Sequence, residues 1–289
     1  MATLNPVRLI AHRGSSATYP EHTRAAYHQA VLDGSDGIET DIRLTQDGAL
    51  VCWHDDTLDR TGGVRGRVRD ASLAALRALD LLDGQRIPQI FGAPSEQLMT
   101  LEELIALLAG ADRPLLLAVE LKPDAGDEAE LVATTLAALQ AAGWDPQTGE
   151  LGDLQISLMC FHLQSVQELL RFVHPSLVMI LTEPDDPEPA PAFDLVELTP
   201  VNAGPGIEWV REDPLRVIRW IESGKTVRIW TVDEPEDLDF CLMLGVREIT
   251  TNRPATLRRA LRAHEEPEPM TESISLESLA AAMAADLVR

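Results

Sequence analysis

Seven side chains that could do chemistry together stand at or just beyond the ends of apolar segments in this sequence. Two are histidines, three are carboxylates, one is an arginine and one a lysine. Charge at such positions is costly to bury without a ligand or a partner, so their conjunction indicates a site. Together they could hold a divalent cation, bind a phosphate group and transfer protons. The seven are His12, Arg13, Glu39, Asp41, His54, Glu120 and Lys122.

The first two of these residues follow an apolar run over residues 7–11. The run ends abruptly in His12, Arg13 and Gly14, as expected of a buried strand that delivers an imidazole and a guanidinium to a glycine-opened loop. The carboxyl ends of the strands are where α/β barrels keep their chemistry. A lone histidine after a strand is usually structural, however, and Arg13 alone could pair with any nearby acid. Only the combination with the other residues indicates function.

Two carboxylates lie two residues apart in the next apolar segment. On a strand, Glu39 and Asp41 would face the same side, where they repel each other unless a cation or a proton lies between them. Asp47-Gly48 is a strong hairpin signal, and a turn there sets residue 41 roughly opposite residue 54. We therefore expect His54 to lie above the two acids.

A third acid comes from a separate segment. The apolar run 115–121 turns polar at its carboxyl end, where Glu120 and Lys122 would share one face of a strand. Carboxylate oxygens without cysteine or clustered histidine ligands select a hard cation such as Mg²⁺ or Ca²⁺ over Zn²⁺. A metal, together with Arg13 and Lys122, could offset the negative charge of a phosphodiester in its transition state.

Three aromatic residues accompany these polar ones. Phe161 and Trp230 each end a predicted strand, so both could line the mouth of a barrel and contact substrate; core packing is an equally good interpretation. Trp53 should point to the side of its strand opposite to His54, which predicts packing.

Eight apolar, strand-like runs with helical patterns between most of them predict an α/β fold, a closed parallel (β/α)8 TIM barrel. Helices are expected to begin at Thr23, at Thr100 with Glu103 as a capping box, and at Asp127. The segment 58–99 is long for a strand-to-helix connection, which predicts an insertion over the carboxyl-terminal face of the barrel where a substrate head group would be selected. The eight runs span residues 7–11, 37–44, 115–121, 154–161, 177–181, 193–198, 226–232 and 247–251.

From residue 8 to about residue 255 the chain resembles the glycerophosphodiester phosphodiesterase family. The shared motifs occur in the family's order and near its usual spacing. Three positions depart from the family pattern: His22 stands where Asn is usual, Gly62 where a second Thr is usual, and Asn252 where Asp is usual. The matching motifs are Ile10-Ala11-His12-Arg13-Gly14, Pro20-Glu21-His22-Thr23, Gly37-Ile38-Glu39-Thr40-Asp41, Thr45-Gln46-Asp47-Gly48, His54-Asp55 and Val119-Glu120-Leu121-Lys122, with Trp230-Thr231-Val232-Asp233 and Leu244-Gly245-Val246 resembling the closing strands.

The resemblance implies an enzyme that hydrolyses a glycerophosphodiester to glycerol 3-phosphate and an alcohol with one divalent cation, Mg²⁺ or Ca²⁺. Two histidines that titrate near neutrality suit the two proton transfers, each typically worth ~10²–10⁴-fold in rate. The attacking oxygen could belong to water or to the neighbouring glycerol hydroxyl of the substrate. The implied roles are metal binding for Glu39, Asp41 and Glu120, general base and acid for His12 and His54, and phosphate binding for Arg13 and Lys122.

Composition limits the partners. The 289 residues carry a formal net charge of −23, which argues against nucleic acid or an anionic membrane surface as a partner. Cys52, Cys160 and Cys241 are an odd set in apolar contexts, as expected of reduced core residues. The start of the sequence shows no signal-peptide pattern, so we expect a cytoplasmic protein without stable membrane association.

Two domains are expected. Residues 1–264 would form the barrel with its insertion, and residues 265–289 an acidic, proline-bearing linker and a helical tail. The oligomeric state and the alcohol head group stay open.

Two other functions also remain open. One is a barrel that binds a phosphorylated ligand without turnover, but such a site would need no acid and base, so His12 and His54 favour an enzyme. The other is a barrel phosphodiesterase that cleaves lysophospholipids. Outside the insertion, the sequence shows no basic amphipathic or aromatic-rich segment that would engage a bilayer.

Overall fold

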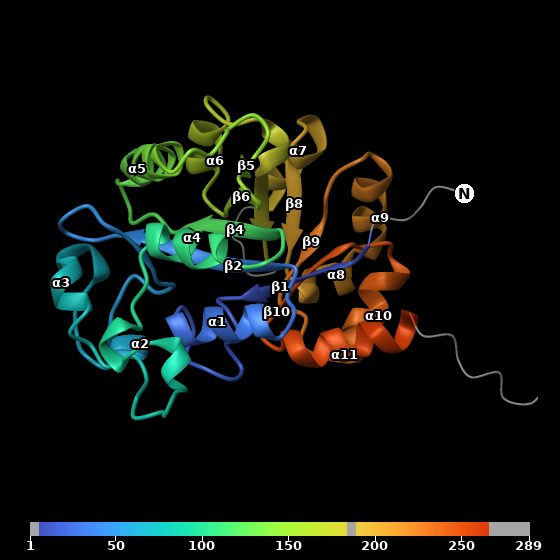
Figure 1. Cartoon of the computed structure of the whole chain (residues 1–289). Coiled ribbons are helices and arrows are strands. Elements are labelled where there is room, and N and C mark those ends of the chain that lie inside the picture. Colours follow the sequence, from blue (N-terminus) through green and yellow to red (C-terminus); the bar gives the residue numbers. More distant parts are fainter. Residues whose placement is uncertain (1–5, 184–188, 266–289) are drawn as a thin grey trace, which may run out of the picture. The chain divides into compact units, whose positions relative to one another are not determined.

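A computed structural model describes residues 6–183 and 189–265 of the chain. Parallel strands form a barrel, with the order β8-β7-β6-β4-β2-β1-β10-β9 (Figure 1). Parallel bridges from Ala203 to Val227 and from Gly206 to Trp230 bring the last strand back to the first one in this order, so the ring is nearly closed. The strands are β1 (Arg8–His12), β2 (Gly37–Leu44), β4 (Leu115–Leu121), β6 (Leu154–Cys160), β7 (Val178–Thr182), β8 (Asn202–Pro205), β9 (Arg228–Ile229) and β10 (Glu248–Thr251). The predicted TIM barrel is therefore confirmed.

One predicted strand is wrong. Residues 193–198 belong to helix α7 (Pro189–Leu198), and the strand at this place in the barrel is β8 (Asn202–Pro205). The ring of Phe193 packs on the outer helices, with its centroid 5.0 Å from that of Trp209. In β8 a Cβ built on Gly204 would lie 2.5 Å from Leu181 Cδ2, so this crowded position excludes the larger residues that usually mark a strand.

Helices surround the barrel (Figure 1). Thr23 caps α1 through its side chain, and Thr100 and Glu103 form the expected capping box of α4. Asp127 stands at the start of α5, as expected, but its side chain makes no capping hydrogen bond. The helices are α1 (Arg24–Leu32), α4 (Leu101–Ala109), α5 (Glu128–Ala141), α6 (Leu163–Leu169), α7, α8 (Ile207–Glu212), α9 (Pro214–Glu222), α10 (Pro235–Met243) and α11 (Pro254–Glu265).

The expected insertion is a small subdomain with its own apolar core. It contains α2 (Asp59–Gly62), α3 (Leu73–Leu76) and three short 3-10 turns. Trp53 is buried in its core against residues that include Leu58, Val68 and Leu76, so this aromatic residue is in packing as expected. The insertion contacts the loops that follow β1 and β4: Gln85 donates to the Thr18 carbonyl, and Arg67 pairs with Asp124. It therefore lies at the carboxyl end of the barrel.

Inward-facing polar residues distinguish this barrel core from an apolar one. Near its amino end, the buried Arg228 and Glu248 form an ion pair of 2.8 Å.

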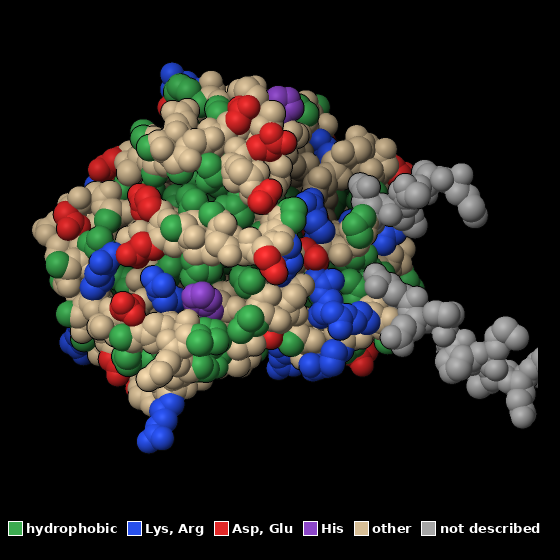
Figure 2. Space-filling model, viewed as in Figure 1, with side chains coloured by type: hydrophobic (Ala, Val, Ile, Leu, Met, Phe, Trp, Pro, Cys, Tyr) green, Lys and Arg blue, Asp and Glu red, His purple; other side chains and the backbone are tan. Residues whose placement is uncertain are grey.

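The three cysteines are buried and free, in agreement with the prediction. On the face shown in Figure 2, acidic and basic side chains are interspersed with apolar ones.

The chain divides into two compact units, residues 1–258 and residues 259–289. The second unit begins inside α11, and the predicted helical tail lies outside the described residues. Within the described part of the chain, no helix is long and apolar enough to cross a membrane.

Candidate active site

Three carboxylates meet at the carboxyl ends of β2 and β4. In the sheet register Asp41 pairs with Glu120, and Glu39 lies two residues before Asp41 on the same face. Glu39, Asp41 and Glu120 are 1%, 0% and 6% exposed, and each offers a ligand atom within 4.8 Å of the others. Their predicted convergence is thus found in the structure, and outward-facing Ile38 and Thr40 lie on the opposite side of β2.

The buried oxygens of this cluster suit a cation. Two of the carboxyl groups keep an oxygen without a hydrogen-bond donor among the described residues, Glu39 Oε1 and Asp41 Oδ1. Lys122 Nζ lies 3.6 Å from this Asp41 oxygen, and it forms an ion pair with Glu120 Oε1 at 2.6 Å. A set of three carboxylates without sulfur ligands fits a hard divalent cation such as Mg²⁺ or Ca²⁺.

Burial and neighbouring charges shift the pKa values of the three carboxyl groups in different directions. Burial raises the pKa of Glu39 well above its usual range, and the charge of Asp41 adds to the effect. Burial likewise raises the pKa of Glu120 to about 8. Although burial opposes ionisation of Asp41 as well, Lys122 and His22 hold its pKa well below the usual range. A bound cation would allow all three groups to ionise together.

Arg13 connects the first loop to the cluster. Its backbone lies in the left-handed region at φ 58°, and its N–H donates to Glu39 Oε2 at 3.0 Å. Its guanidinium Nε lies 3.1 Å from Asp41 Oδ2. The next residue, Gly14, has φ 84° and approaches the backbone of Ala26 so closely that a Cβ would lie 2.6 Å from its carbonyl carbon. Glycine is therefore required for the loop that positions Arg13.

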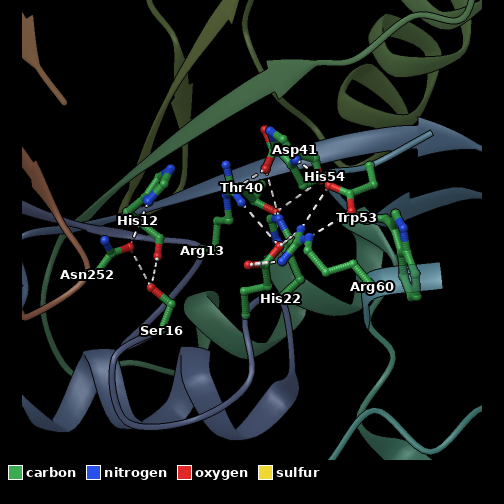
Figure 3. Close-up of polar contacts among 12 residues, drawn as sticks. His12, Arg13, Ser16, His22, Thr40, Asp41, Trp53, His54, Arg60 and Asn252 are labelled. Atoms are coloured by element: carbon green, nitrogen blue, oxygen red, sulfur yellow. Dashed lines mark hydrogen bonds and ion pairs between the residues drawn. The ribbon is translucent and has the colours of Figure 1, made fainter. Parts of the chain in front are cut away.

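His12 is held in one tautomer by a chain of hydrogen bonds (Figure 3). The side-chain amide of Asn252 donates to Asp233 Oδ2 at 2.6 Å, so its oxygen faces His12 Nδ1, 2.8 Å away. Ser16 donates to the same amide oxygen. His12 Nδ1 therefore carries the proton, and its Nε2, 3.9 Å from Glu39 Oε2, is left as a proton acceptor. Burial, reinforced by Arg13, lowers the pKa of His12 to about 4, so the ring is neutral at physiological pH.

His54 lies one position further along than the sequence predicted. In the pairing of β2 with β3 (Leu50–Cys52), Ile42 lies opposite Cys52, and Trp53 N–H donates to the Asp41 carbonyl. The residue opposite Asp41 is therefore Trp53. The reason is the loop: Thr45 N–H donates to the Ala49 carbonyl, and Ala49 N–H donates to the Thr45 hydroxyl, which closes a longer turn than the expected two-residue one.

The His54 ring nevertheless belongs to the site. It lies in the loop after β3, where Arg43 Nε donates to the His54 carbonyl at 2.8 Å. Its Nδ1 lies 2.7 Å from Asp55 Oδ1. Burial lowers the pKa of His54, and the charge of Asp41 acts in the opposite direction.

The two aromatic residues pack against each other, which was one of the two interpretations that the sequence left open, and contact with substrate stays a prediction. The rings of Phe161 and Trp230 pack edge to face at 5.6 Å, against a buried apolar cluster that includes Met159 and Leu181. Lys122 Nζ lies 5.4 Å from the centroid of Phe161. Trp230 also lines a small cavity, together with His12, Glu39 and Glu120.

Several site residues were not predicted as functional. His22 is 3% exposed, with Nε2 2.9 Å from Asp41 Oδ2 and Nδ1 2.8 Å from the Tyr27 hydroxyl. Further charged side chains contact Arg13 and His54: Glu21 pairs with Arg13, and Asp55 contacts both His54 and Arg60. These residues come from loops and the insertion, where no periodicity marks them. Asn252 directly follows a strand, so the rule that selected His12 could have found it.

Comparison with known proteins gives consistent matches. Residues 12–256 match the model of the glycerophosphoryl diester phosphodiesterase family. A Mycobacterium tuberculosis protein named probable glycerophosphodiester phosphodiesterase 1 is 36% identical over 249 residues, 85% of this chain and 89% of the relative. A Bacillus subtilis glycerophosphodiester phosphodiesterase is 28% identical over 275 residues, 90% of this chain and 89% of the relative. The solved structure of an Oleispira antarctica phosphodiesterase in complex with the product sn-glycerol-3-phosphate superposes with a TM-score of 0.71 at 25% identity, covering 88% of this chain and 96% of that one.

Proposed function

This chain belongs to the glycerophosphoryl diester phosphodiesterase family and is an enzyme that hydrolyses glycerophosphodiesters, and we propose that it does so with one divalent cation and two histidines. The products are glycerol 3-phosphate and an alcohol. The observation that carries the proposal is the convergence of three buried carboxylates, of which Glu39 and Asp41 each keep one oxygen without a hydrogen-bond donor among the described residues.

Glu39, Asp41 and Glu120 would hold the cation, which we infer to be Mg²⁺ or Ca²⁺ from the all-oxygen donor set. When bound, the cation supplies positive charge that offsets the developing charge of the phosphoryl oxygens. Arg13 Nε and Lys122 Nζ already lie beside Asp41, at 3.1 and 3.6 Å. Both can therefore add to the binding of a phosphate placed at the cluster.

The two histidines are suited to different proton transfers by their partners. His12 Nδ1 faces a neutral amide oxygen, so its unprotonated Nε2 can accept a proton from the attacking oxygen. His54 Nδ1 faces the Asp55 carboxylate, which opposes the lowering of the His54 pKa by burial. His12 has no such carboxylate at Nδ1, so His54 is the better suited of the two rings to protonate the leaving alcohol. The attacking oxygen belongs either to water or to the 2-hydroxyl of the glycerol moiety, and a transient cyclic phosphate would identify the second route.

Trp230 and Phe161 would form the apolar wall of the substrate site. Trp230 lines the same cavity as His12 and Glu39. Its indole N–H is occupied, because it donates to the Gly204 carbonyl at 2.7 Å. The ring face can therefore contribute packing against the glycerol moiety or the head group.

The test is release of glycerol 3-phosphate from glycerophosphocholine and glycerophosphoethanolamine, before and after treatment with EDTA and after addition of Mg²⁺ or Ca²⁺. We expect release that EDTA abolishes and one of the two cations restores. Tight binding of the diesters without release under any of these conditions would support a barrel that only binds its ligand.

A further inference from the structure

Arg60 is the insertion residue that reaches the catalytic loops from α2. We propose that it is a positioning residue, which fixes the His54 ring by holding the Asp55 carboxylate. The inference rests on the proposed function of His54 as the acid that protonates the leaving alcohol.

One guanidinium makes hydrogen bonds to two carboxylates on different loops (Figure 3). Arg60 Nε and Nη2 donate to the two oxygens of Asp55 at 2.7 and 2.9 Å. Arg60 Nη1 and Nη2 donate to the two oxygens of Glu21 at 2.9 and 2.7 Å. The planar guanidinium matches carboxylates in this two-pronged geometry, which a lysine cannot reproduce.

Each carboxylate in turn contacts a residue of the proposed machinery. Asp55 Oδ1 lies 2.7 Å from His54 Nδ1. Glu21 Oε1 accepts a hydrogen bond from Arg13 Nη1 at 3.2 Å. Arg60 therefore lies between the loop that carries Arg13 and the loop that carries His54. It binds Glu21 of the first loop and Asp55 of the second.

The contact with Asp55 selects the reactive nitrogen of His54. Hydrogen bonds from Arg60 lower the pKa of Asp55 well below its usual range, so this carboxylate is ionised and can only accept a hydrogen bond. His54 Nδ1 must then be the donor, and Nε2 is the atom left for proton transfer. When the ring is protonated, Asp55 accepts the hydrogen bond from Nδ1–H and orients the ring, and the proton on Nε2 is the one transferred to the leaving alcohol.

A purely structural role for Arg60 is the competing explanation. Its side chain is 51% exposed, and an ion pair at that exposure contributes little to stability. The insertion is also attached by other contacts: its apolar core packs on Trp53, and Arg67 pairs with Asp124 at 3.0 Å. Loss of Arg60 should therefore leave the insertion folded and attached.

The experiment compares two diesters of glycerol 3-phosphate, one with choline and one with p-nitrophenol. The choline alkoxide needs a proton to leave, whereas p-nitrophenolate leaves without one. We expect Arg60→Met to lower kcat for the choline ester by about 10- to 100-fold, a fraction of what a general acid contributes, and to lower kcat for the nitrophenyl ester far less. Arg60→Lys should recover part of the loss. Arg77→Met is the matched control, because Arg77 lies on the same insertion and forms an exposed ion pair with Glu103 of α4.

Two results would overturn the proposal. One is an Arg60→Met variant with wild-type kcat for the choline ester, and the other is an equal loss on both esters. A further check uses His54→Ala: if Arg60 acts through His54, adding Arg60→Met to that variant should cause no further loss. If the wild-type protein releases no glycerol 3-phosphate from either ester, the proposed function itself fails.

Discussion

Asn252 turns its amide oxygen to His12 Nδ1, 2.8 Å away, because its amide nitrogen is bound to Asp233. Asp55 takes the equivalent place at His54, 2.7 Å from Nδ1. The two imidazoles thus differ in the charge of the group behind them, a neutral amide for His12 and a carboxylate for His54. This difference supports the assignment of one ring as base and the other as acid.

His12→Ala should lower kcat by about 10²- to 10⁴-fold while leaving metal binding intact, because His12 would transfer a proton and is not one of the three carboxylates. Kinetics at saturating metal and calorimetric titration of Mg²⁺ or Ca²⁺ measure the two properties separately. Wild-type kcat in this variant would remove His12 from the mechanism. Loss of metal binding would instead indicate that its contact with Glu39 organises the cluster.

His22→Ala should destabilise the protein by about 1–3 kcal/mol, because buried Asp41 loses a hydrogen-bond donor and Tyr27 loses its contact with the ring. His22→Asn should cost less, since Asn tolerates the φ of 60° at this position and its amide can take the place of Nδ1 beside the Tyr27 hydroxyl. Urea unfolding of the two variants gives the comparison. Equal stability of wild type and both variants would show that the His22 contact with Asp41 is not stabilising.

Glu21 should make the protein lose stability at acid pH. Although burial opposes its ionisation, hydrogen bonds from Arg60 and the charge of Arg13 lower its pKa to about 2, from 4.5 in an unfolded chain. Because the folded pKa is the lower one, the ionised group stabilises the fold above pH 4.5, and this contribution is lost as the pH falls from about 4.5 towards 2. The contribution at neutral pH is at most about 3 kcal/mol.

Glu21→Gln should therefore flatten the dependence of unfolding free energy on pH in that window. Urea unfolding at several pH values measures this slope. Glu234→Gln is the control, because Glu234 and its partner Arg253 form an exposed ion pair elsewhere on the molecule. An unchanged slope in Glu21→Gln would contradict the expected coupling between Glu21 and its two arginines.

The strands that carry the three carboxylates could be predicted to the residue, because β2 and β4 are bounded apolar runs with charge only where the site begins. Strand β8 could not be predicted from the sequence. Asn202-Ala203-Gly204-Pro205 lacks β-branched and aromatic residues, whereas residues 193–198 have apolar side chains at spacings that fit either a strand or a helix. Only the folded barrel shows that residues 202–205 form the strand and that residues 193–198 belong to a helix.

The side chains of the site could be predicted where they end a strand, but their supporting partners could not. Arg60 and Glu21 come from an insertion and a loop, and only the folded chain brings them together. The one-residue error in the position of His54 has the same origin. Asp47-Gly48 indicates a turn, but the bond from Ala49 N–H to Thr45, which fixes the register, involves residues outside that pair.

If the three carboxylates hold a catalytic cation, metal binding and catalysis must rise together over one range of cation concentrations. EDTA-treated protein is titrated with Mg²⁺ or Ca²⁺, with heat of binding and glycerol 3-phosphate release from glycerophosphocholine as readouts, for wild type and Glu39→Gln. We expect one bound cation per chain, half-maximal activity at the concentration that half-saturates this site, and loss of both binding and activity in Glu39→Gln. Full activity of the EDTA-treated protein, or binding unaffected by Glu39→Gln, would contradict this expectation.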